Sequence, residues 1–118
     1  ESDSVLEALN QLKTDDTVAQ LRDEYAADLV QLIGDFDTYC GVGNPYTGLP
    51  SSGYSVVKAN CLDGYVHTSF FGTNMGGNYD RTSTTVNTAY SHGYRYCTGV
   101  DQYRTLMTTA FSCGTSPI

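Results

Sequence analysis

The sequence predicts one small domain of the α/β (α+β) class, spanning residues 1–118. Three observations support this class. Two segments with helical periodicity occupy the first 25 residues, an apolar run at residues 29–33 and a β-prone run at residues 54–57 follow, and the second half is rich in glycine and tyrosine. A chain of 118 residues buries only a modest core. We therefore expect its four cysteines to add to its stability.

Two amphipathic helices are predicted at the start of the chain. Ser4 and Glu7 form an S-x-x-E capping box, which is followed by apolar residues at helical spacing. A second N-cap signal lies within residues 14–17, and apolar residues then recur at i, i+3 and i+7 over residues 18–25. The acidic side chains of both segments most simply form a solvated face.

The next segments carry strand and loop signals. By period alone, residues 29–33 extend the second helix or form a buried strand, and the glycine and aspartates of residues 34–37 favour a boundary after them. Residues 40–52 are predicted to be loop. Residues 54–57 form a β-prone run that leads to Cys61.

Beyond Gly64 the glycine density predicts mostly irregular structure. Two exceptions are expected, a helix near residues 66–75 and a short helix around residues 101–108. The sequence contains no internal repeat.

Charge and hydropathy exclude several partners. The formal net charge is −7, and residues 1–37 carry ten acidic residues against two basic ones. Nucleic-acid binding needs a basic face, so this balance argues against it. No apolar run of about 18 residues is present, and no membrane span is expected. The chain begins at Glu1 without signal-peptide features, and we interpret it as a processed or partial chain.

The four cysteines, Cys40, Cys61, Cys97 and Cys113, are separated by 20, 35 and 15 residues. These spacings match no C-x-x-C zinc or redox pattern, so two disulfides in an oxidising compartment are the simpler interpretation. Sequence alone allows three pairings, of which we favour Cys40 with Cys61 and Cys97 with Cys113. The expected location is secreted or extracellular, and the alternative is a cytosolic protein with four reduced cysteines.

Residues 69–80, S-F-F-G-T-N-M-G-G-N-Y-D, resemble the zinc-binding helix of the metzincin peptidases, H-E-x-x-H-x-x-G-x-x-H-D. The frame of that pattern is kept at Gly72, Asn74, Met75, Gly76 and Asp80. The working positions are not kept. Ser69 and Thr73 stand at the two helical histidines. Phe70 stands at the glutamate position, and Tyr79 stands at the third histidine.

The replacements remove the chemistry of the pattern. A catalytic zinc needs about three basic nitrogen or oxygen donors and a water that the ion activates. The neutral hydroxyls of Ser69 and Thr73 are poor zinc ligands, and Phe70 cannot act as a base. Tyr79 could bind a metal only as a phenolate, which is scarce near neutral pH. The sequence therefore predicts that the site holds no metal and the protein uses no cofactor.

Two histidines lie outside the pattern. His67 precedes the first ligand position by two residues, and His92 lies farther along the chain. For each, a surface or hydrogen-bonded histidine is a simpler interpretation than a metal ligand. A site built from His67, His92 and Tyr79 is the alternative, although no spacing rule predicts it.

Nearly the whole chain is similar to the reprolysin-like branch of the metzincins. The similar segments follow in the family's order: residues 21–30 (L-R-D-E-Y-A-A-D-L-V), 39–42 (Y-C-G-V), 54–61, the degenerate zinc helix, 93–97 (G-Y-R-Y-C) and 103–107 (Y-R-T-L-M).

The resemblance carries several structural implications. It implies that residues 29–33 form a strand and that residues 54–61 form an antiparallel edge strand. It also implies that Met107 is the Met-turn methionine beneath the former metal site. Ala26 replaces the glycine that closes the family's helix, at a position where left-handed geometry favours glycine.

The family's first strand, helix and second strand have no counterpart before Glu1. The resemblance thus implies a truncated domain with a small mixed sheet, two or three helices and a loop-rich C-terminal half stapled by disulfides. A sheet without two of its strands exposes backbone donors and acceptors along an edge. Either further polypeptide covers that edge, or another subunit adds a strand to it and builds a head-to-tail filament.

The function implied by the resemblance is that of an inactive homologue, an extracellular structural or interaction module with identical subunits as partners. Tyrosines such as Tyr79, Tyr90, Tyr94 and Tyr96 offer contact surface or simply local packing. One alternative is a zinc-dependent or other hydrolase with an atypical site, although no G-x-S-x-G elbow is present. Another is a glycan-binding module, suggested by the tyrosine, asparagine and glycine content.

Overall fold

The computed structural model describes residues 4–37, 39–80, 90–98 and 102–108. The chain forms two compact units, Glu1–Gly76 and Gly77–Ile118. Described residues of the first unit form three α-helices and a three-stranded sheet, and those of the second form a two-stranded sheet. The α+β class predicted from the sequence is confirmed, with a mixed sheet, several helices and a disulfide.

The elements of the first unit are α1 (Val5–Thr14), α2 (Asp16–Glu24), β1 (Val30–Gly34), β2 (Gly41–Gly43), η1 (Pro50–Ser52), β3 (Tyr54–Lys58), η2 (Ala59–Gly64) and α3 (Val66–Asn74). The second unit contains β4 (Arg95–Tyr96) and β5 (Tyr103–Arg104). Helices α1 and α2 lie where helical periodicity predicts them, and α3 lies where a helix near residues 66–75 was expected. Strand β1 resolves the ambiguity at residues 29–33 in favour of a strand.

Local signals start the first two helices. Ser4 occupies the N-cap of α1 in an extended conformation, although its side chain makes no capping hydrogen bond. Asp15 caps α2, because its carboxylate accepts a hydrogen bond from the Val18 N–H at 3.0 Å. The buried stripe of α1 consists of Val5, Ala8, Leu9 and Leu12. No residue of α2 is fully buried, so α1 supplies the helical side of the core.

The strand order in the first unit is β1-β3-β2, with β3 parallel to β1 and antiparallel to β2. The prediction of an antiparallel edge strand over residues 54–61 is therefore wrong. The strand ends at Lys58, the 3-10 helix η2 follows, and β3 is central. Burial explains this position, because four consecutive residues of β3 are buried, as expected for a strand covered on both faces.

The antiparallel edge strand is β2, which lies within the segment predicted to be loop. Gly41, Val42 and Gly43 pair with Val57, Val56 and Ser55, respectively. Glycine has a low intrinsic preference for strands, but pairing with a neighbouring strand often decides the conformation. The loop prediction for residues 40–52 is thus wrong at β2 and at η1.

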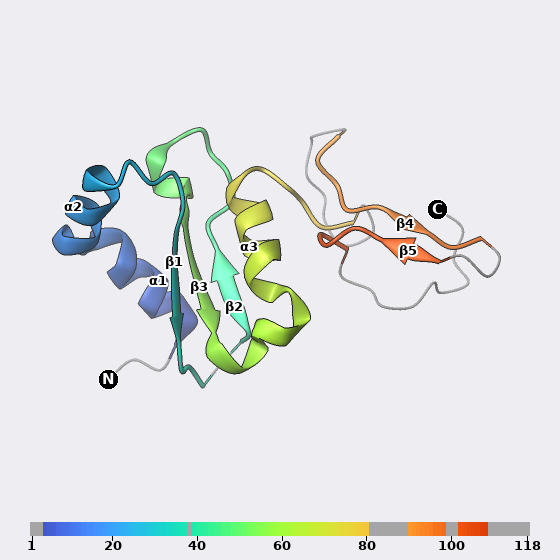
Figure 1. Cartoon of the computed structure of the whole chain (residues 1–118), viewed down its shortest axis with the longest axis horizontal. Coiled ribbons are helices and arrows are strands. Elements are labelled where there is room, and N and C mark those ends of the chain that lie inside the picture. Colours follow the sequence, from blue (N-terminus) through green and yellow to red (C-terminus); the bar gives the residue numbers. More distant parts are fainter. Residues whose placement is uncertain (1–3, 38, 81–89, 99–101, 109–118) are drawn as a thin grey trace. The chain divides into compact units, whose positions relative to one another are not determined.

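Two layers of helix cover the sheet of the first unit (Figure 1). Helices α1 and α2 lie on one side of the sheet, and α3 lies on the other side (Figure 1). The core lies between α1 and β3, where Val5, Leu9 and Leu12 pack with Tyr54 and Val56. Helix α3 packs against β2 and β3. This arrangement places α3 over the antiparallel half of the sheet.

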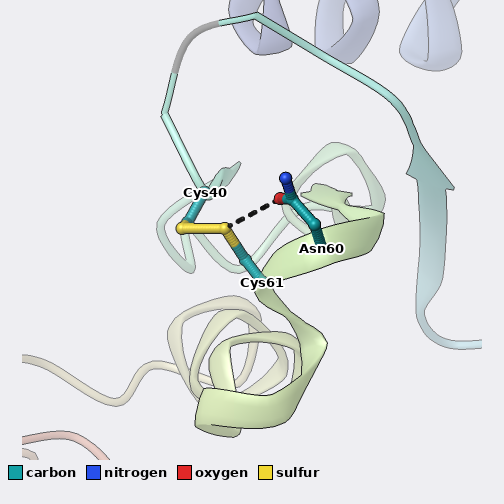
Figure 2. Close-up of a disulfide and its surroundings, with 3 residues drawn as sticks. All are labelled: Cys40, Asn60 and Cys61. Atoms are coloured by element: carbon teal, nitrogen blue, oxygen red, sulfur yellow. Dashed lines mark hydrogen bonds between the residues drawn. A yellow bond between two sulfur atoms is a disulfide. The ribbon is translucent and has the colours of Figure 1, made fainter.

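A disulfide joins Cys40, just before β2, to Cys61 in η2, as predicted (Figure 2). Figure 2 also shows Asn60 Oδ1 3.5 Å from the Cys61 Sγ. A disulfide sulfur carries no hydrogen, so we regard this as a polar contact and not as a hydrogen bond. Cys97 is disulfide-bonded as well. Its predicted partner, Cys113, lies outside the described residues.

Arg22 holds the connection between α2 and β1. Its Nε donates to the carbonyl oxygen of Ala27 at 3.0 Å, and its two terminal nitrogens donate to the carbonyl oxygens of Asp28 and Pro50, both at 2.7 Å. Ala26 lies inside this connection with a φ of +49°, so it adopts the left-handed conformation although it is not a glycine. The guanidinium therefore ties a strained turn to η1.

Replacing Arg22 with methionine is expected to lower the free energy of unfolding by about 2 kcal/mol, because three carbonyl oxygens lose a charged donor. Arg22→Lys keeps the charge but lacks the planar fork, so it should recover only part of the loss. Urea unfolding of the three proteins measures the difference. Losses below about 0.5 kcal/mol in both variants, typical of ordinary surface positions, would contradict this role.

The second unit is built around β4 and β5, which pair antiparallel with Arg95 opposite Arg104 and Tyr96 opposite Tyr103. The short helix predicted around residues 101–108 is wrong over residues 102–108. The Thr105 N–H and the Thr108 hydroxyl both donate to the Tyr94 carbonyl oxygen, at 2.9 and 3.1 Å. These hydrogen bonds to a distant residue override the weak helical signal.

None of the helices in the described part of the chain has the length and apolar character needed to cross a membrane.

Candidate functional site

Helix α3 carries three of the four degenerate zinc-site positions. The Ser69 Oγ donates to the carbonyl oxygen of Val66 at 2.8 Å, and the Thr73 Oγ1 donates to the carbonyl oxygen of Ser69 at 3.2 Å. Serine and threonine inside helices commonly bond back to the preceding turn in this way. Both hydroxyl hydrogens are thus directed at the backbone of α3.

Phe70 lies against the edge strand β2. A Cβ atom on Gly41 would lie 2.5 Å from the Cε2 of the Phe70 ring, and one on Gly43 would lie 3.3 Å from its Cδ1. Contacts this short are not available to a side chain, so the ring occupies the space that the two glycines leave open. At the position of the pattern's glutamate, the chain therefore has an apolar side chain used in packing.

Asn74 closes α3 and is almost completely buried, with 3% of its surface exposed. Its Nδ2 contacts three carbonyl oxygens, those of Asn44, Ser52 and Tyr54, at 2.9, 2.8 and 3.0 Å. Its Oδ1 is buried without a hydrogen-bond partner in the structure. Asn74 thus joins α3 to β3, to η1 and to the residue that follows β2.

Gly76 supplies the turn after α3. Its N–H donates to the Thr73 carbonyl oxygen at 3.1 Å, and its φ is +94°, in the region that favours glycine. The helix followed by a glycine turn, which the aligned pattern requires, is therefore present in the structure.

Tyr79 and Met107 belong to the second unit. The Tyr79 side chain is 36% exposed, and its carbonyl oxygen accepts a hydrogen bond from the His92 Nδ1 at 2.9 Å. Met107 lies in a tight turn, where the Thr108 N–H donates to the Thr105 carbonyl oxygen at 3.1 Å. The predicted role of Met107 beneath a former metal site stays a prediction.

His67 lies in α3 of the first unit, and its Nδ1 is buried without a hydrogen-bond partner in the structure. The alternative site of His67, His92 and Tyr79 is thus divided between the two units. Within the described residues, no cluster of three or more histidine, cysteine, aspartate or glutamate side chains is arranged to hold a metal ion.

A cavity of about 560 Å³ opens at the C-terminal end of α3 in the first unit. Asn74 and Met75 line it together with Tyr46, Leu49 and Arg22. The three side-chain nitrogens of Arg22 already donate to carbonyl oxygens. The walls that these five residues form are therefore mainly apolar and aromatic. Ser69, Phe70 and Thr73 do not line it.

Ser69 and Thr73 were predicted to be poor metal ligands, and Phe70 was predicted to be unable to act as a base. What these side chains do instead was not predicted. The packing of Phe70 had one usable signal, the two glycines of G-V-G at residues 41–43, since glycine in a strand often marks a close approach. For the burial of Asn74 the sequence offers a weaker signal, which is an asparagine at the end of a predicted helix.

Comparison with known proteins gives a fold but no family. No family model matches the sequence, and no curated protein matches it significantly. The fold is similar to that of a chain in the solved structure of a chaperone–substrate complex, with a TM-score of 0.68 and 21% sequence identity. The match covers 91% of this chain and 18% of that chain, so this chain spans less than a fifth of that chain's length. At this identity the likeness shows the fold alone.

Proposed function

We propose that the protein is a non-catalytic, extracellular structural or interaction module with a metzincin-like fold, and that identical subunits are its partners. One observation carries the proposal: the side chains at the former zinc-site positions of α3 have structural roles. The hydroxyls of Ser69 and Thr73 bond to the helix backbone, and the ring of Phe70 packs on β2. None of these groups is placed to bind an ion or to activate water.

Two further features agree with an extracellular interaction role. The Cys40–Cys61 disulfide and the bonded Cys97 are compatible with an oxidising compartment. The solved structure with a similar fold was determined as a chaperone–substrate complex, which is an assembly of proteins. Protein partners are therefore more consistent with these features than a small-molecule substrate.

The proposal is tested by zinc binding. We expect the purified wild-type protein to bind no stoichiometric zinc in isothermal titration calorimetry and to cleave no peptide library. The informative variant is Ser69→His/Thr73→His, which places two histidines at i and i+4 of α3 and keeps Phe70 in its packed position. This variant should bind zinc in a 1:1 ratio, because two imidazoles at this spacing lie on one face of a helix.

The matched control is Ser69→Ala/Thr73→Ala, which changes the same positions without adding ligands. It should bind no zinc. Zinc binding by the wild type together with peptide cleavage would contradict the non-catalytic role. Failure of the two-histidine variant to gain zinc, while its far-ultraviolet circular dichroism stays unchanged, would contradict the assignment of Ser69 and Thr73 to former zinc-ligand positions.

A further inference from the structure

The sheet of the first unit has an open parallel edge at β1. Among the described residues, β3 is the only strand that pairs with β1. The Val30 N–H donates to the Gly53 carbonyl oxygen at 2.8 Å, on the β3 side. Backbone groups of alternate residues point to opposite sides of a strand, so the Ile33 N–H and carbonyl point away from β3. The outer edge of β1 thus presents a donor and an acceptor suited to another strand.

The exposed side chains of this edge, Leu32 and Ile33, are apolar, and the residues around it are acidic. Leu32 is 37% exposed and Ile33 is 51% exposed, which is high for aliphatic residues in a strand. Helix α3 packs mainly on β2 and β3 and reaches β1 at Gln31, whose Nε2 donates to the His67 carbonyl oxygen at 3.1 Å. Asp28, Asp35 and Asp37, at the two ends of β1, are exposed. A strand that adds here would therefore be favoured if it combined apolar or aromatic side chains with positive charge.

The chain contains such a segment in its second unit. Tyr94, Tyr96 and Tyr103 gather on the β4–β5 ribbon, with the rings of Tyr96 and Tyr103 stacked at 5.0 Å. Their exposed fractions are 52%, 37% and 60%. Arg95 and Arg104 lie directly opposite each other in the same ribbon, and like charges in that relation are unfavourable for a strand pair.

The two units also differ in charge, the first being acidic and the second slightly basic. Residues 1–76 contain eleven acidic residues against three basic ones, whereas residues 77–118 contain two acidic residues against three arginines. The carboxylates around β1 and the arginines of the ribbon are therefore complementary when they belong to different copies of the chain.

We propose that the β4–β5 ribbon of one copy adds to the outer edge of β1 in the next copy. This inference rests on the proposed function and names its contact. Backbone hydrogen bonds from the Ile33 edge join the two chains. The three tyrosines share one face of the ribbon, so they cover Ile33, which lies on the opposite face of β1 from Leu32. Arg95 and Arg104 approach Asp35 and Asp37. Because the two surfaces differ, the contact is heterologous and each added copy leaves one free surface at each end of the assembly.

Two one-sided variants test the contact. Ile33→Pro removes an N–H that points away from β3, so it blocks the outer edge and keeps the ladder with β3. Arg95→Glu/Arg104→Glu reverses the charge of the ribbon. In sedimentation velocity, the wild type is expected to form longer assemblies as concentration rises, and each variant alone should associate at least about tenfold more weakly. A 1:1 mixture of the two variants should form a dimer and nothing longer, because each copy retains one working surface.

Controls separate this contact from misfolding and from other modes of association. Ile33→Val keeps the outward N–H and should assemble like the wild type. If Ile33→Pro loses helical circular dichroism, Asp35→Lys/Asp37→Lys replaces it, since that variant blocks the same edge without changing a strand residue. A ribbon variant that still assembles as the wild type does would show a symmetric contact between β1 edges, and would overturn the proposal.

Two other results would also overturn it: a wild-type protein that is monomeric at every concentration, and a variant mixture that forms no dimer. A monomeric wild type that also binds no zinc and cleaves no peptide would remove this contact, and the non-catalytic character of the module would be unaffected. Zinc binding with peptide cleavage would instead remove the proposed function, whatever the assembly state.

Discussion

Replacing Asn74 with aspartate is expected to lower the free energy of unfolding by about 4 kcal/mol, the largest loss that we predict for a single substitution. The Nδ2 group of Asn74 is surrounded by the carbonyl oxygens of Asn44, Ser52 and Tyr54. An aspartate of the same shape places a carboxylate oxygen against these acceptors. The variant thus loses every side-chain donor at this point and buries a charge without a partner.

The three acceptors are not equally dependent on Asn74. The Tyr54 carbonyl oxygen also accepts a hydrogen bond from the Asn44 N–H at 3.0 Å. The other two carbonyls depend more on the amide. Asn74→Ala, which removes the donor without adding charge, should therefore cost less, about 2 kcal/mol. The difference between the two variants measures the contribution of the charge.

Urea unfolding at two pH values checks this prediction. Burial disfavours the charged carboxyl, so the pKa of an aspartate at position 74 should be higher in the folded protein than its unfolded value of about 3.9. The cost of Asn74→Asp should then be small at or below about pH 4 and should grow as pH rises towards the folded pKa. Asn74→Ala should show no such pH dependence relative to wild type. Equal losses for both variants at neutral pH would mean that position 74 is open to water.

How much of the fold follows from the sequence depends on the range of the interactions that form each element. The periodicity of α1 and α2 and the N-cap at Asp15 are local, and both helices were predictable. The G-V-G segment of β2 becomes a strand only through its ladder with β3, and its own residues favour a loop. The helix predicted around β5 was wrong for the same reason, because Thr105 and Thr108 form hydrogen bonds with Tyr94, which is distant in the sequence.

The candidate site divides in a similar way. That Ser69 and Thr73 cannot replace histidines as zinc ligands follows from their chemistry alone. That their hydroxyls bond to the backbone of α3 requires the helix to be in place. The role of Asn74 was not predictable, because its three acceptors come from residues 20 to 30 positions earlier in the chain. A frame residue of the pattern is thus explained by packing without reference to a metal.

Replacing Phe70 with glutamate, the residue of the zinc-peptidase pattern at this position, is expected to lower the free energy of unfolding by about 3 kcal/mol. The ring fills the space above Gly41 and Gly43, whose missing side chains leave room for it. A glutamate fills that space incompletely and places a carboxylate beside the edge strand, where partial burial disfavours its charge. The substitution therefore weakens the contact between α3 and β2.

Two matched variants divide this loss into packing and charge. Phe70→Leu keeps an apolar side chain and should cost less than about 1.5 kcal/mol. Phe70→Gln has the shape of glutamate without its charge, and should cost an amount between those of Phe70→Leu and Phe70→Glu. Thermal and urea unfolding of the three variants gives the order. If Phe70→Glu were as stable as the wild type, the ring would not pack on β2, and a carboxylate at position 70 would be compatible with the fold, so the main support for a non-catalytic α3 would be lost.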